Sequence, residues 1–398
     1  MLSARGRIAE LDGLRGLAIS LVVTLHYFVF VAQPQSPLMK GLVQLFKLSW
    51  SGVDLFFVLS GFLIGGILLD AKNSPSYFRT FYCRRFFRII PLYAFWLALF
   101  AIGVYITGDA TGPATPENLS FNFNTSHVPL WSYALFLQTF FMSIHNSFGS
   151  EWMGITWSLG VEEQFYLLLP LVIRALNRTL VTKLACAMIL IAPVLRIGLQ
   201  AYSNTGVAAY TLLPCRMDAF GCGLLVALGM RNEKVWAAIK NHRKYLQMAF
   251  VVLSLGLVKW TLFDSWTMTQ IGFTWMAGFY ACLLLLVLSA PGQTLSLMFQ
   301  NRFLVWMGTI AYPIYLFHSG ILYLLHYLFP ATPTASVVAV SLALVLLLAS
   351  ASWRFVEGPL IRYAHARFHY GTSRTQLSVR SLSQPVVPIV SLASVVRR

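Results

Sequence analysis

A histidine lies within the first long apolar run of this chain, where an ionisable group is costly and usually functional. The run follows Gly16, and His26 stands eleven residues after Arg15. On a helix this separation is about 16 Å and close to three turns, which puts both groups on nearly the same face. Imidazole titrates near neutral pH, so His26 is a candidate general base. A packed histidine bonded to a neighbouring carbonyl is the alternative that the sequence leaves open.

Carboxylates in two other apolar segments could orient that imidazole. Asp54 lies in GVDLFFVLSGF, and Glu162 lies in TWSLGVEEQFY. A carboxylate beside an imidazole is a usual arrangement for a general base, so we predict a catalytic group of His26 with Glu162 or Asp54. The expected outer half of these segments holds further candidates for binding a substrate, which are His318, Glu163, Arg216, Asp218 and Trp157. The structural alternative is that Arg216, Asp218 and Asp54 form ion pairs that tie helices together.

Arginines gather at the opposite end of the apolar segments. The motif FYCRRFFRIIP places Arg84, Arg85 and Arg88 where the third segment begins, and spacings of three and four residues share a helix face. The planar guanidinium matches phosphate oxygens with paired donors. With Arg15, these residues are candidates for binding a phosphorylated donor whose long arm reaches His26, as coenzyme A would. Ordinary anchoring of the chain by basic residues at the cytoplasmic face is the alternative.

The elements that position these groups are membrane helices. Hydrophobic residues make up 58% of the 398 residues and charged residues 11%, whereas soluble proteins carry about a quarter charged residues. We therefore expect an all-α polytopic membrane protein and no nucleic-acid partner, because the basic residues are dispersed between apolar runs. Ten segments are apolar enough to cross a bilayer: 16–32, 52–69, 88–107, 158–174, 182–200, 211–230, 246–263, 270–289, 303–328 and 335–353.

Charge predicts the orientation of these segments. The chain has 29 lysines and arginines, yet the fifty residues from 108 to 157 contain none. Because basic residues collect in cytoplasmic loops, we expect ten spans with both termini in the cytoplasm and segment 108–157 outside. We expect a membrane domain over residues 1–368 and a disordered basic tail over 369–398. The five cysteines show no spacing typical of a metal site, so no metal or permanently bound cofactor is expected.

The motifs also resemble a known family, the integral membrane acyltransferases of the acyltransferase-3 type, which modify bacterial cell-surface sugars. The resemblance spans nearly the whole chain and is carried by seven stretches in order: LDGLRGLAISLVVTLHY, GVDLFFVLSGFLIGGIL, FYCRRFFRIIPLY, TWSLGVEEQFYLLLP, LPCRMDAFGCG, GTIAYPIYLFH and SWRFVEGPL. It implies about ten spans in the bacterial inner membrane, acyl-CoA as cytoplasmic co-substrate and O-acylation of an extracytoplasmic carbohydrate. It implies functional roles for Arg15, His26, Arg85, Arg88 and Glu162.

These observations combine into a hypothesis of acyl transfer. Acyl-CoA, most simply acetyl-CoA, would bind at the inner arginines, and His26 would remove a proton from an acceptor hydroxyl that attacks the thioester; an acyl-histidine intermediate is a variant. His318 would bind the acceptor or stabilise the oxyanion. A proton-coupled transporter and a membrane assembly component are the other classes that the sequence allows. Outer aromatic residues would stack on sugar rings or form the interface belt: Phe121, Phe123, Trp131, Tyr133, Trp152 and Trp157.

Overall fold

The structure is a computed structural model that describes residues 8–31, 36–107, 125, 127–203, 206–262 and 266–371. Every regular element within these ranges is helical. The predicted all-α fold is confirmed. The disordered tail predicted for 369–398 lies outside the described residues from position 372 onward, as do Phe121 and Phe123 of the predicted outer loop.

The ten predicted apolar segments all fall on helices. Within the described residues, seven helical stretches are long and apolar enough to cross a membrane, and an eighth is counted if the bent pair of α16 (Arg302–Thr309) and α17 (Ala311–Leu328) is one span with a 73° bend. Two further helices, α8 (Trp157–Ala175) and α13 (Arg243–Leu262), correspond to the remaining predicted segments and carry more polar residues. The protein is therefore a polytopic helical membrane protein.

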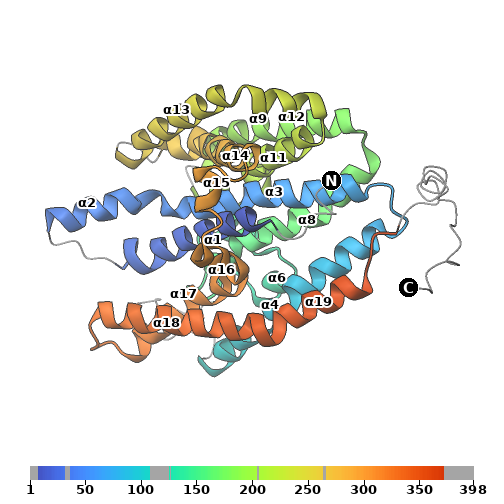
Figure 1. Cartoon of the computed structure of the whole chain (residues 1–398). Helices are drawn as coiled ribbons and strands as arrows, with labels where there is room; N and C mark the ends of the chain where they lie inside the picture. Colours follow the sequence, from blue (N-terminus) through green and yellow to red (C-terminus); the bar gives the residue numbers. More distant parts are fainter. Residues whose placement is uncertain are drawn as a thin grey trace, which may run out of the picture.

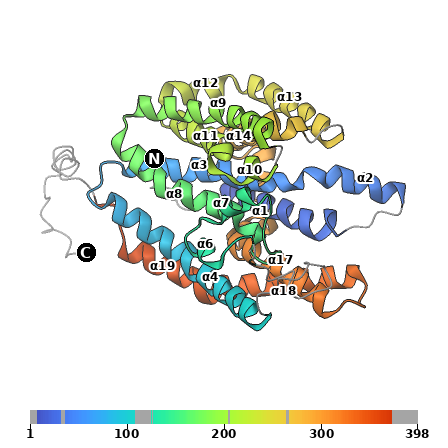
Figure 2. The ribbon, with the colours of Figure 1, turned by 180° about the vertical axis from the view of Figure 1, so that it is seen from behind.

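The long helices form three groups that Figures 1 and 2 show from opposite sides. The middle group contains α1 (Ala9–Thr24), which continues into a π-helical turn, η2 (Leu25–Val29), together with α3 (Gly52–Ala71) and α8. Above it in Figure 1 lie α9 (Arg178–Ser203), α11 (Leu213–Met230), α12 (Glu233–Asn241), α13 and α14 (Phe273–Ser289). Below it lie α4 (Tyr77–Thr107), α17, α18 (Thr334–Ser352) and α19 (Gly358–Arg367).

Short helices and turns connect the long ones. They are α2 (Pro37–Leu45), η3 (Phe46–Ser51), α6 (Leu130–Ala134), α7 (Gln138–Ile144), η4 (Gly154–Thr156), α10 (Gly206–Thr211), η5 (Met268–Gly272), α15 (Thr294–Met298) and η6 (Trp353–Glu357). In Figure 1 the helix α2 projects away from the bundle at the end opposite to α19.

Glycines allow the middle helices to approach one another closely. A methyl group at Gly16 would lie 1.9 Å from the carbonyl oxygen of Leu304, and one at Gly308 would lie 1.8 Å from that of Asp12. The same holds between α3 and α11, where a methyl group at Gly61 would lie 2.1 Å from the oxygen of Phe220. Small residues at such contacts let membrane helices pack backbone to backbone. This packing fixes α1, and with it the two residues Arg15 and His26, relative to its neighbours.

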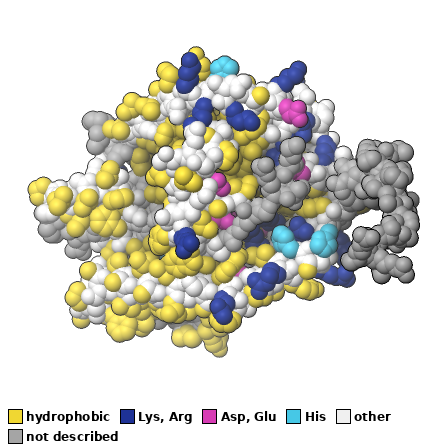
Figure 3. All heavy atoms as spheres, viewed as in Figure 1, with side chains coloured by type: hydrophobic (Ala, Val, Ile, Leu, Met, Phe, Trp, Pro, Cys, Tyr) yellow, Lys and Arg dark blue, Asp and Glu magenta, His cyan; other side chains and the backbone are white. Residues whose placement is uncertain are grey.

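One end of the bundle is basic. In Figure 3 hydrophobic side chains cover the flanks of α2 and α18, whereas basic and histidine side chains gather toward the end where α19 finishes. The segment after α19 returns to this end, because the carbonyl oxygen of His369 accepts hydrogen bonds from Ser76 (2.7 Å) and Thr80 (2.9 Å). The chain at His369 therefore packs against the start of α4.

Candidate active site

Two pockets lie on either side of the start of α8. We name the two pockets after the predicted orientation of the chain. The inner pocket, of about 130 Å³, is lined by Arg15, Ser60, Arg85, Arg88, Glu162 and Tyr166 among others. The outer pocket, of about 340 Å³, is lined by His26, Trp50, Phe148, Glu151, Trp157 and Tyr210 among others. The predicted arginine group and the predicted His26 group thus each include residues that line a cavity, and the helix formed by α1 and η2 contributes to both cavities.

Three guanidinium groups face the inner pocket. Arg15 comes from α1, while Arg85 and Arg88 come from one face of α4. Arg85 lies over the ring of Tyr166, 5.5 Å from its centroid, and Arg15 pairs with Asp12 at 3.8 Å. Glu162 is the acidic residue among the lining residues, so this pocket carries an excess of positive charge suited to an anionic ligand.

Glu162 belongs to this inner pocket and lies away from His26. Its carboxylate accepts hydrogen bonds from the hydroxyls of Ser60 (3.0 Å) and Tyr166 (3.1 Å). The neighbouring Glu163 lines neither pocket, and its Oε1 has no hydrogen-bond partner among the described residues. The predicted contact between Glu162 and His26 is therefore corrected. Trp157 faces the outer pocket, whereas Glu162 lies more than one helical turn further along α8 and faces the inner one.

Arg84 turns away from both pockets. Its Nε donates to the carbonyl oxygen of Phe368 (2.8 Å), and its guanidinium lies over the ring of Tyr370 at 5.4 Å. The structure thus places the three arginines of the motif in two different surroundings. Arg85 and Arg88 face the pocket, and Arg84 holds the segment that follows α19.

His26 lies in the π-helical turn η2, a geometry that often marks functional sites. Its Nδ1 lies 2.9 Å from the carbonyl oxygen of Val22. Because a carbonyl oxygen can only accept, this hydrogen bond requires the ring hydrogen on Nδ1 and leaves a lone pair on Nε2. A backbone carbonyl thus orients the imidazole in the place where a carboxylate was predicted. The neutral ring is prepared to accept a proton.

His318 stacks edge-on against His26, with ring centroids 4.7 Å apart. It is completely buried, and its Nδ1 lies 2.7 Å from the carbonyl oxygen of Tyr315, so Nδ1 also carries the hydrogen. Its Nε2 has no hydrogen-bond partner among the described residues. In this tautomer the free nitrogen accepts a hydrogen bond and cannot donate one. His318 lines neither pocket, so the structure places it behind His26, in contact with the His26 ring, and does not place it among the residues that face a ligand.

Asp54 and Arg216 form a buried ion pair that lines neither pocket. Their Oδ1 and Nη2 atoms lie 2.6 Å apart, and both side chains are 1% exposed. The guanidinium of Arg216 also lies 3.9 Å from the ring centroid of Phe273. The distances correct the predicted contact between Asp54 and His26 and favour the structural alternative for Asp54.

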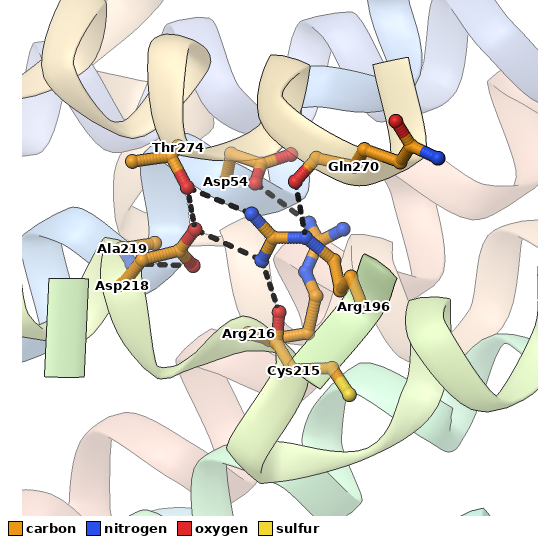
Figure 4. A network of polar contacts seen from close by, with 8 residues as sticks. All are labelled: Asp54, Arg196, Cys215, Arg216, Asp218, Ala219, Gln270 and Thr274. Atoms are coloured by element: carbon orange, nitrogen blue, oxygen red, sulfur yellow. Dashed lines mark hydrogen bonds and ion pairs between the residues drawn. The ribbon is translucent and has the colours of Figure 1, made fainter. Parts of the chain in front are cut away.

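Asp218 has a different partner from the one that the sequence suggested. Figure 4 shows the guanidinium of Arg196 of α9 facing both Asp218 and Thr274, which also contact each other. The carboxylate of Asp218 accepts from Arg196 (3.0 Å) and from the Thr274 hydroxyl (2.6 Å), and Arg196 also donates to the carbonyl oxygens of Cys215 and Gln270. Arg216 and Asp218 do not pair with each other, because residues two apart on a helix point to different sides, but each forms an ion pair with another helix, as in the structural alternative. Two crossed pairs join α3, α9, α11 and α14.

The outer pocket also contains groups to which the sequence analysis gave no role. Glu151 lies between α7 and η4, and burial raises the pKa of its carboxyl group while a hydrogen bond from Tyr323 opposes that rise. Tyr210 stacks on Trp157 with ring centroids 4.5 Å apart, and Tyr315 lines this pocket as well. The motif YPIYLFH was available as a signal, since its tyrosines precede His318 at three-residue spacing.

The fold is thus a bundle of membrane helices with one pocket lined by arginines and a second pocket lined by His26 and aromatic residues. The profile of the family described as "Acyltransferase domain", of the acyltransferase-3 type, matches residues 8–354. The chain belongs to this family. No solved structure matches the chain.

Curated relatives of the chain are bacterial. It is 26% identical to the peptidoglycan O-acetyltransferase OatA of Listeria monocytogenes over 99% of this chain and 62% of the relative. It is 25% identical to the putative peptidoglycan O-acetyltransferase YrhL of Bacillus subtilis over 89% of this chain and 55% of the relative. It is also 25% identical to the O-acetyltransferase OatA of Staphylococcus aureus, over 90% of this chain and 58% of the relative. The alignments thus cover somewhat more than half the length of these relatives.

Proposed function

We propose that this protein transfers an acyl group, acetyl in the first instance, from cytoplasmic acyl-CoA to a hydroxyl of an extracytoplasmic or lipid-linked carbohydrate. The observation that carries the proposal is the pair of pockets along one helix. The positively charged pocket contains Arg15, and the histidine pocket contains His26 eleven residues later. That interval is about 16 Å along a helix, within reach of the arm of coenzyme A.

The inner pocket would bind the donor. Arg85 and Arg88 are one helical turn apart and present their guanidinium groups to the same cavity as Arg15. Guanidinium groups bind phosphate oxygens through charge-assisted hydrogen bonds, which are stronger than neutral ones. Glu162, already bonded to Ser60 and Tyr166, would hold the arginine side of the pocket in place as a positioning residue.

His26 would act as the general base. Its Nε2 lone pair takes the proton of the acceptor hydroxyl while the hydroxyl oxygen forms a bond to the thioester carbonyl carbon. The carbon–sulfur bond then breaks, and the proton on His26 passes to the departing thiolate. The overall products are one ester and one free thiol. His318, whose ring contacts that of His26 edge-on at 4.7 Å between centroids, would hold the His26 ring in place as a positioning residue.

The outer pocket would bind the acceptor sugar. Trp50, Phe148, Trp157 and Tyr210 give it aromatic surfaces, and Glu151 gives it a carboxylate. Aromatic rings and a few polar groups are a usual combination in ligand pockets. The relatives are named for O-acetylation, two of them for peptidoglycan, so peptidoglycan is the first acceptor to test. Other surface polysaccharides follow, and the plasma membrane of a bacterium is the proposed location.

Release of thiol tests the reaction directly. Purified protein with acetyl-CoA and a glycan should release free CoA and form an equal amount of glycan ester, measured by thiol titration and mass spectrometry. His26→Ala should insert normally and lose about 10²- to 10⁴-fold in ester formation, the usual contribution of a general base. Ester formation at the native rate by this variant would remove the assignment of the base. A protein that moves protons without releasing CoA would be a transporter.

A further inference from the structure

One side chain is common to the two pockets. Among the lining residues that the structure describes, Tyr315 of α17 is the residue that faces both the inner and the outer cavity. The neighbouring tyrosine of the same helix, Tyr312, lines the inner pocket, and Ser319 lines the outer one. The passage along α17 from one cavity to the other therefore goes past the ring of Tyr315.

Two hydrogen bonds hold this ring across the boundary. The hydroxyl of Tyr315 donates to the carbonyl oxygen of Ile155, which lines the outer pocket. It lies 2.6 Å from the hydroxyl of Ser158, which lines the inner pocket. Because the single hydroxyl hydrogen of Tyr315 goes to the carbonyl, the Ser158 hydroxyl donates to Tyr315. The side chain thus bridges from α17 to the start of α8, at the boundary between the cavities.

The backbone of the same residue touches the histidine pair. The carbonyl oxygen of Tyr315 accepts from Nδ1 of His318 at 2.7 Å, and the two rings lie 5.8 Å apart. His318 in turn contacts His26 at 4.7 Å between centroids. A movement of the Tyr315 side chain would therefore occur beside the proposed base.

We propose that Tyr315 is a gating residue that separates the two cavities at rest and moves aside to let the acyl thioester reach His26. The proposal rests on the proposed function and adds the element that would keep outside water from the thioester until an acceptor is present. Excluding water from a reactive group in this way prevents hydrolysis. To move aside, Tyr315 would break the hydrogen bonds of its hydroxyl to Ile155 and Ser158. Gates that open in each catalytic cycle are known in many enzymes.

Accessibility from the two sides of the membrane tests the position of the gate without any catalysis. Tyr315→Cys, Ser60→Cys and Ser319→Cys are placed in proteoliposomes and exposed to a membrane-impermeant methanethiosulfonate from one side or the other. The native protein, with its five free cysteines, supplies the background. Tyr315→Cys should react from both sides, Ser60→Cys from the arginine side and Ser319→Cys from the histidine side. Reaction of Tyr315→Cys from one side only, or from neither, would overturn the proposal.

Coupling tests the gate in the working enzyme. The ratio of CoA released to ester formed should be about one in the native protein and should rise at least about fivefold in Tyr315→Ala, because water then reaches the thioester. Tyr315→Phe keeps the ring, loses its hydrogen bonds and should give a smaller rise. Tyr93→Phe is the matched control, since the buried Tyr93 hydroxyl donates to the carbonyl of Tyr133 (2.9 Å) away from both pockets.

The two failures can be told apart. A ratio that stays at one in both Tyr315 variants, while ester is still formed, would refute the gate and leave the proposed function standing. A native protein that releases no CoA would refute the proposed function, and the labelling pattern would still decide whether Tyr315 separates the cavities.

Discussion

Removing one partner of the buried pair between Asp54 and Arg216 should destabilise the protein far more than removing one partner of a similar pair at the surface. The contact in each case is 2.6 Å, so distance does not distinguish them. Burial does: both side chains of the first pair are 1% exposed, whereas Arg231 and Asp70 are 12% and 28% exposed. The two pairs therefore show how burial changes the loss of stability when one charged side chain loses its partner.

The expected magnitudes follow from that burial. Asp54→Leu leaves the guanidinium of Arg216 in the interior with Nε and Nη1 already lacking hydrogen-bond partners among the described residues, which should cost about 3–5 kcal/mol. Asp70→Leu leaves Arg231 able to reach water and should cost about 0–1 kcal/mol. The double variant Asp54→Leu with Arg216→Met replaces both charges by apolar groups and should recover most of the loss.

The free energy of unfolding, measured by denaturant titration in detergent micelles, decides the matter. A double-mutant cycle over Asp54 and Arg216 should show strong coupling, because each single variant exposes the other charge to an apolar surrounding. The reasoning is refuted if Asp54→Leu costs no more than Asp70→Leu, or if the double variant is less stable than either single one.

Three further outcomes are expected. Arg85→Ala with Arg88→Ala should raise the Michaelis constant for acetyl-CoA and change that for the glycan less than about twofold, since these residues face the inner pocket; steady-state kinetics check this. The native protein should lose stability as the pH rises above about 4.5, because burial raises the pKa of the Glu151 carboxyl in the folded protein and the unfolded chain therefore ionises first. Glu151→Gln should remove this loss, and unfolding titrations of both proteins from pH 4 to 8 check this. Gly16→Ala should lower the unfolding free energy because its methyl group would meet the Leu304 carbonyl at 1.9 Å, whereas Gly198→Ala, with open space around it, should not.

The helices could be predicted because the hydropathy and charge of about twenty consecutive residues together indicate a membrane helix. Each of the ten apolar runs became helical, and the positions of Arg15 and His26 on one helix followed from helical geometry alone. The 73° bend between α16 and α17 was not predicted, although Pro313, three residues after the break at Ile310, is a residue that disfavours a continuous helix there.

The pairing of buried charges was beyond reach of the sequence for a different reason. Arg216 and Asp218 are neighbours in the chain, yet their true partners, Asp54 and Arg196, come from other helices. Similarly, Glu162 lies in the same motif as Trp157, but the boundary between the pockets falls between them. Depth along a helix and direction around it both decide which pocket a side chain faces, and a single sequence specifies neither for helices whose packing is unknown.

The central claim is that one donor spans from the inner arginines to the boundary beside His26. Electron cryo-microscopy of the protein with a non-hydrolysable acetyl-CoA analogue tests it most directly. Phosphate density is expected beside Arg15, Arg85 and Arg88, with the acyl end directed at Tyr315. An acyl end directed away from Tyr315 and His26, or a nucleotide bound elsewhere on the protein, would contradict it.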